Sequence, residues 1–290
     1  MIYQVTHTTT YDYGEPVSLC HNLVHLKPRS GPLQSTRDFH LAIEPVPAVL
    51  DESIDYFGNP IAHFTLQEPH RRLRATATHR TEVVAPSKPE PARTPAWEEA
   101  KTQIWQADAP VLLDALQYTF SSKYIPRSGN LAHYALPSFK PGRPILEAVL
   151  DLTHRIHTEF AYDPRSTTIH TTLDEVLTGR RGVCQDFAHL QIGCLRSLGL
   201  AARYLSGYLM TVPEAGKARL VGADASHAWL AVFVPGHGWI AVDPTNDLIP
   251  GDQHILLAWG RDYDDVSPIK GVIVGGGKHS VAVSVDVAPV

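Results

Sequence analysis

The chain is poor in cysteine and has no long apolar run. Only three of its 290 residues are cysteines, and so small and odd a number does not form the disulfide framework of a small secreted domain. No apolar stretch approaches the ~20 residues of a membrane helix. The polar start of the chain also lacks the basic and apolar segments of a secretory signal. We therefore expect a cytoplasmic protein that does not span a membrane.

Basic charge and metal-binding motifs are also scarce. The net charge is −5 and the lysines and arginines are scattered, which argues against a nucleic-acid partner. The chain has 16 histidines, but the closely spaced pairs His21/His25 and His154/His157 lie outside any His-Glu-x-x-His pattern, and there is no Cys-x-x-Cys. We expect neither a metal nor a cofactor.

The remaining composition, 43% hydrophobic and 19% charged, is typical of a soluble globular protein. Short alternating stretches separated by turn residues predict a β-sandwich over residues 1–85. Residues 85–95 contain four prolines, which predicts a stiff linker over 86–96. From residue 97 the hydrophobic period becomes helical, and strand-like stretches follow after residue 200. We assign residues 97–290 to an α+β domain with a C-terminal strand.

One cysteine has an unusual local context. Cys184 follows a loop that contains Gly179 and Gly182, and the residues after it form an apolar helical stripe that ends at Gly199. These features place Cys184 at a helix N-terminus, where free N–H groups and a partial positive charge favour a thiolate. By contrast, we expect Cys20 and Cys194 to be small buried hydrophobes.

A nucleophilic thiol needs a base and a residue that orients the base. His227 opens one strand-like stretch and Asp243 closes the next, with the turn sequence Pro235-Gly236-His237-Gly238 between them. A hairpin folded at residue 235 places His227 and Asp243 opposite or nearly opposite each other on one sheet face, whereas a slip of one residue separates them. Cys184, His227 and Asp243 are thus a candidate triad of nucleophile, base and orienting acid.

Neighbouring residues fit simpler roles. His189 lies ~140° around the helix from Cys184 and is expected to be structural. Asp186 suits the first helical turn with its side chain directed away from the thiol. Arg180 and Arg181 either support the thiolate or are solvated surface residues. The backbone N–H of Cys184 is one oxyanion donor, and Gln185 and Tyr162 are weak candidates for a second.

The combined motifs resemble the transglutaminase-like superfamily. The resemblance is carried by Gly182-Val183-Cys184-Gln185-Asp186-Phe187-Ala188, by residues 198–208, by Ser226-His227-Ala228-Trp229 and by residues 238–245. The first 85 residues resemble the β-rich N-terminal domain of bacterial members. The resemblance implies a papain-like α+β core with Cys184, His227 and Asp243 as the catalytic triad.

This resemblance does not determine the reaction, because members include cross-linkers, peptidases, amidases and noncatalytic scaffolds. We expect a cysteine-dependent hydrolase that acts on a peptide or another amide through an acyl-enzyme. The alternatives are acyl transfer from a protein glutamine to an amine, and a noncatalytic binding scaffold. The sequence gives no indication of the oligomeric state.

Overall fold

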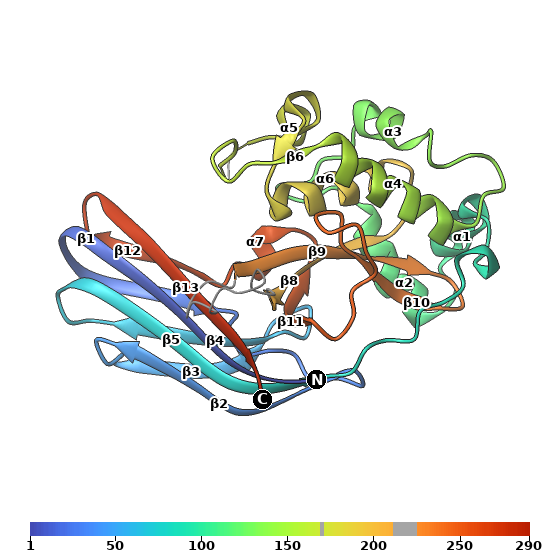
Figure 1. The fold of residues 1–290 in the computed structure, drawn as a ribbon. Helices are drawn as coiled ribbons and strands as arrows, with labels where there is room; N and C mark the ends of the chain where they lie inside the picture. Colours follow the sequence, from blue (N-terminus) through green and yellow to red (C-terminus); the bar gives the residue numbers. More distant parts are fainter. Residues whose placement is uncertain (169–170, 211–224) are drawn as a thin grey trace, which may run out of the picture.

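The computed structural model describes residues 1–168, 171–210 and 225–290. It consists of a large antiparallel sheet at the N-terminus and an α+β core (Figure 1). This confirms the predicted fold class. Among the described residues, no helix has the length and apolar character needed to cross a membrane.

The N-terminal sheet is built around one long strand. Strand β1 (Ile2–Val24) hydrogen-bonds with four of the six other strands. These are β5 and β13 along its first half, and β4 and β12 along its second half. Alternate residues of β5 are buried, as the period-two pattern of the sequence predicts. The other strands of this sheet are β2 (Gln34–Glu44), β3 (Val49–Ile54), β4 (Pro60–Leu66), β5 (His70–Val83), β12 (Ile269–Gly275) and β13 (His279–Pro289).

The C-terminal strands β12 and β13 return to the N-terminal sheet. Strand β13 pairs with β1 from Tyr3↔Pro289 to Tyr13↔His279, so both termini lie at the same end of the sheet (Figure 1). Pairing satisfies the backbone groups of an otherwise open β1 edge. The predicted 97–290 domain therefore contains two strands whose hydrogen-bond partners lie in the first 85 residues, which the sequence did not reveal.

The core contains a four-stranded antiparallel sheet in the order β10-β9-β8-β11. Its strands are β8 (Ala202–Leu209), β9 (Ala225–Val234), β10 (Gly238–Val242) and β11 (His254–Gly260). Figure 1 shows α4, α5 and α6 on one side of this sheet and the N-terminal sheet on the other. The helices are α1 (Trp97–Gln106), α2 (Pro110–Leu116), α3 (Gly129–Ala135), α4 (Ile145–Glu159), α5 (Leu173–Gly179), α6 (Cys184–Ser197) and α7 (Tyr263–Val266). Short 3₁₀ turns η1 (Pro91–Arg93) and η2 (Gln117–Thr119) complete this part of the chain.

Helix α6 lies inside the core and contacts α3, α5, β8 and β9. Even its arginine is buried: the guanidinium of Arg196 donates to the carbonyl oxygen of Ala202 at 2.8 Å and to that of Arg261 at 2.7 Å. Backbone acceptors thus compensate the buried charge. The helix is held along its length, which fixes the position of its N-terminus.

Two side-chain amides join the N-terminal sheet to the open edge of β11. The amide of Gln34 donates to Leu256 O and accepts from Leu256 N, both at 2.8 Å. Asn59 makes the same two-way contact with Trp259, at 2.8 and 3.0 Å. Each amide imitates a strand partner, so the edge of the core sheet is satisfied by the other part of the molecule.

Candidate active site

Cys184 is the first residue of α6, as the sequence predicts. The chain reaches it through β7 (Arg181–Gly182), which pairs in parallel with β6 (Ala161–Tyr162). A Cβ on Gly182 would lie 2.8 Å from the Asp186 side chain, so this approach needs a glycine. Cys184 is half-buried, whereas Cys20 and Cys194 are fully buried.

Asp186 supports the same turn. Its Oδ2 accepts hydrogen bonds from Val183 N at 2.8 Å and from the hydroxyl of Thr167 at 2.7 Å. Burial raises the pKa of Asp186, and these two hydrogen bonds oppose that effect. The carboxylate is therefore used to hold the start of the helix, which is the role predicted for it.

His227 and Asp243 meet across the β9–β10 hairpin. The observed pairs run from Gly238↔Val234 to Val242↔Leu230, and continuing this register places Asp243 opposite Trp229. The two residues therefore meet on a diagonal rather than directly, but on the same face. Their contact is close, with 2.8 Å between His227 Nε2 and Asp243 Oδ2.

Asp243 is fully buried and accepts hydrogen bonds on both oxygens. Its Oδ1 accepts from the backbone N–H of Thr245 at 2.9 Å, and its Oδ2 accepts from the side-chain amide of Asn246 at 2.7 Å. The same Oδ2 accepts from His227 and from His254, the latter at 3.0 Å. Burial alone would raise the pKa of Asp243, but these donors hold it well below its usual range. The Asp243 carboxylate therefore remains ionised although it is fully buried.

The environment of His227 favours the imidazolium form. Burial lowers its pKa, but the hydrogen bond to Asp243 acts in the opposite direction. The Cys184 thiol, a second hydrogen-bonding neighbour, adds to this effect, and the pKa of His227 is raised to about 9. Because Nε2 binds Asp243, Nδ1 is the ring nitrogen left for the thiol. The structure thus brings all three predicted residues together.

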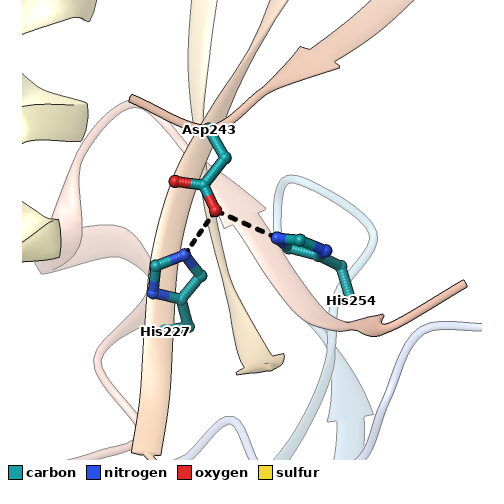
Figure 2. A group of neighbouring side chains, drawn as sticks. All are labelled: His227, Asp243 and His254. Carbon is teal, nitrogen blue, oxygen red and sulfur yellow. Dashed lines mark hydrogen bonds and ion pairs between the residues drawn. The ribbon is translucent and has the colours of Figure 1, made fainter. Parts of the chain in front are cut away.

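His254 was missed by the sequence reasoning. It opens β11, and Figure 2 shows its ring and that of His227 directed at one oxygen of Asp243 from two different strands. His254 is only 6% exposed, and its Nδ1 has no hydrogen-bond partner among the described residues. No local motif marks it, because its proximity to Asp243 arises from the β8–β11 pairing.

His227, Asp243 and His254 also form a group with a metal-compatible spacing, since their ligand atoms lie within 4.8 Å of one another. The distances of 2.8 and 3.0 Å to the carboxylate are those of N–H···O hydrogen bonds. A cation would have to replace both of these protons. The geometry fits a hydrogen-bonded carboxylate better than a metal site.

Other residues near Cys184 are engaged elsewhere. His189 is buried and accepts from Tyr263 N at 3.1 Å, and burial lowers its pKa to about 3, in line with the structural role predicted for it. The guanidinium of Arg180 pairs with Glu159 at 2.7 Å, which favours the surface interpretation of this arginine. Burial raises the pKa of Tyr162, and the charge of Cys184 adds to this, so the tyrosine lies near the thiol.

Comparisons with known proteins cover nearly the whole chain. Residues 3–82 match the bacterial transglutaminase-like N-terminal region, and residues 133–244 match the transglutaminase-like superfamily. An uncharacterized protein of Mycobacterium tuberculosis is 41% identical over 99% of this chain and 92% of its own length. A protein-glutamine gamma-glutamyltransferase of Pseudomonas aeruginosa is 30% identical over 43% of this chain but only 19% of its own length.

Among solved structures, a protein of Cytophaga hutchinsonii described as a "putative cysteine protease" has a similar fold. Its TM-score is 0.76 at 22% identity, over 99% of this chain and 90% of that one. At this level of identity, the likeness extends to the fold alone.

Proposed function

Because this chain belongs to the transglutaminase-like superfamily, we propose that it is a thiol hydrolase that cleaves an amide bond of a peptide or related substrate. Cys184 is the nucleophile, His227 the general base and acid, and Asp243 the residue that orients the imidazole. The observation that carries the proposal is the buried His227–Asp243 contact of 2.8 Å, with the Cys184 thiol as the other neighbour of the ring.

The first half of the reaction forms an acyl-enzyme. The Cys184 thiol gives its proton to His227, the sulfur attacks the carbonyl carbon of the amide, and the C=O bond becomes a C–O⁻ bond. The backbone N–H of Cys184 at the start of α6 is placed to donate to this oxygen, with Gln185 and Tyr162 as candidates for a second donor. Collapse of the intermediate breaks the C–N bond, and the departing amine takes the proton of His227.

The second half releases the acid. A water molecule gives a proton to His227 and attacks the thioester carbon, and the C–S bond breaks to return the thiolate. Asp243 stabilises the imidazolium in both halves, since its carboxylate accepts from Nε2 throughout. No step requires a metal or a cofactor.

Transfer of the acyl group to an amine is the second candidate function. Only the final acceptor differs, with an amine in place of water. The gamma-glutamyltransferase relative favours this reaction, although the chain matches only a small part of that protein. A reducing cytoplasm would keep the Cys184 thiol available for either reaction, and we propose that location.

Incubation of the protein with a glutamine-containing peptide and a labelled primary amine separates the two functions. The hydrolase proposal predicts free acid with little labelled product at millimolar amine, and the leaving group is ammonia from the glutamine side chain or a new amino terminus from a peptide bond. Labelled product in excess of free acid would establish acyl transfer instead. Cys184→Ala should abolish both products, whereas the buried-thiol variant Cys20→Ala should retain them.

A further inference from the structure

A cavity of about 210 Å³ lies where the N-terminal sheet meets the core sheet. The side chains around it are mostly apolar, and two of them are tryptophans. Sites for small organic molecules combine such apolar walls with a few polar groups. The apolar part includes Leu33, Val84, Leu205, Trp229, Trp239 and Leu256.

Arg203 supplies a buried positive charge to this wall. It is only 9% exposed, and its guanidinium lies 4.3 Å from the centre of the Trp239 ring and 3.7 Å from that of Trp259. Burial lowers its pKa to about 10, so it remains charged at neutral pH.

Within residues 1–168, 171–210 and 225–290, Arg203 has no carboxylate at ion-pair distance and its Nε has no hydrogen-bond partner, although the Tyr118 side chain hydrogen-bonds to the guanidinium and Asp114 is a more distant negative charge. A second cation lies nearby, since the guanidinium of Arg29 is 3.4 Å from the centre of the same Trp259 ring. A buried charge whose nearest carboxylate lies beyond ion-pair distance is only partly compensated. This part of the cavity is therefore suited to an anion.

His254 supplies a second polar group to the same cavity. Its Nε2 donates to Asp243, which leaves Nδ1 as the unpartnered buried nitrogen described above. A neutral ring can accept from a ligand hydroxyl at Nδ1, and a protonated ring can donate to a carboxylate. The lining thus carries two incompletely satisfied polar side chains, each at least nine-tenths buried.

We propose that this cavity binds a small organic anion, a carboxylate on a single-ring or branched apolar body. The carboxylate pairs with Arg203, and the apolar part packs against Trp229 and Trp239 in the direction of His254. The size is suitable, because an apolar cavity of ~150 Å³ is enough to hold benzene.

The site is separate from the candidate nucleophile, since Cys184 is not among the lining residues. It nevertheless adjoins the candidate triad. His254 binds Asp243, and Trp229 stacks on His227 with 5.8 Å between the ring centres. An occupant would contact both of these neighbouring residues.

Titration with phenylacetate, its neutral analogue phenylacetamide and the cation phenethylamine tests the proposal, with tryptophan fluorescence as the signal. Wild type should bind phenylacetate at least 10-fold more tightly than phenylacetamide and should not bind phenethylamine. Cys184→Ala should behave as wild type, so the result does not depend on the proposed catalysis.

Two variants and one control locate the site. Arg203→Gln should remove the preference for the acid, and Ala241→Leu, which places a larger side chain in the wall, should weaken phenylacetate binding at least 10-fold. Arg127→Gln removes an exposed arginine outside the cavity and should leave binding unchanged. The proposal is overturned if wild type shows no saturable phenylacetate binding, if it binds the acid and the amide equally, or if Ala241→Leu binds as wild type.

Discussion

Replacing Asp243 by asparagine should move the titration of His227 by about two pH units. The wild-type pKa of about 9, compared with the ordinary 6.5, corresponds to about 3 kcal/mol in favour of the imidazolium. Asparagine removes the negative charge but leaves the ring buried, and burial lowers the pKa of a histidine. We therefore expect the pKa of His227 in Asp243→Asn to fall toward 6.5, with the Cys184 thiol as a remaining neighbour that raises it.

Activity should be lost as the pH rises through the pKa of His227, because the protonated ring acts as the acid. Wild type should stay active up to about pH 9, because about nine-tenths of His227 is protonated at pH 8. At a His227 pKa of 6.5, only about 3% would be protonated at that pH, so the alkaline limb of kcat/KM in Asp243→Asn should move toward pH 6.5. Nitrogen NMR of the imidazole ring measures the pKa, and the pH-rate profile measures its effect.

Asp247→Asn is the matched control. It makes the same chemical change four residues away, at a carboxylate that pairs with the exposed His154 at 2.7 Å. This variant should leave the titration of His227 in place. The reasoning is refuted if His227 titrates at the same pH in wild type and in Asp243→Asn.

Three further predictions concern stability and the surroundings of the site. Burial lowers the pKa of both His7 and His79 to about 4, so below pH 6.5 the unfolded chain binds protons that the folded chain does not. As the pH falls from 6.5 to 4, the free energy of unfolding should decrease by about 1.4 kcal/mol per pH unit for each histidine. Urea titrations at pH 7 and 4.5 will measure this decrease. His254→Phe removes one donor to a buried carboxylate, so kcat should drop about 10- to 100-fold while KM changes little in steady-state assays. Gly207→Ala places a Cβ against the carbonyl oxygen of Ile255 and the ring of Trp229, and should lower the free energy of unfolding by about 1–3 kcal/mol in urea titrations.

Each of these predictions has a clear contrary result. A urea midpoint that is equal at pH 7 and 4.5 would contradict the protonation argument, and His7→Asn should reduce the pH dependence. An unchanged kcat in His254→Phe would show that the hydrogen bond from His254 to Asp243 is not needed for catalysis. Gly31→Ala, whose added Cβ meets no atom within 4 Å, is the control for Gly207→Ala, and equal losses in the two would contradict the crowding argument.

The start of α6 could be predicted from the sequence because its signals are local. A glycine-rich approach, a helical apolar stripe and a C-terminal glycine mark both ends, and the structure has the helix at Cys184–Ser197 with Gly199 at a φ of +87°. The hairpin was also local in origin. The observed pairing of the hairpin is shifted by two residues relative to a hairpin centred on residue 235. A shift of two residues keeps His227 and Asp243 on the same face of the sheet.

Features that depend on distant pairing could not be predicted. His254 reaches Asp243 because β11 pairs with β8 on the far side of β9, an order that no spacing in the chain encodes. Likewise, β13 alternates like any half-buried strand, and nothing local shows that its partner is β1, more than 260 residues earlier. The buried Arg203 belongs to this group as well, since its cavity is formed by segments from both parts of the molecule.

The central claim is that Cys184 becomes covalently acylated and that His227 enables this step. Intact-mass and peptide mass spectrometry of protein quenched in acid during turnover of an activated amide substrate tests it directly. The account predicts an acyl adduct on the peptide that contains Cys184, formed at least 100-fold more slowly in His227→Ala. An adduct on Cys20 or Cys194, or turnover that persists in Cys184→Ala, would contradict it.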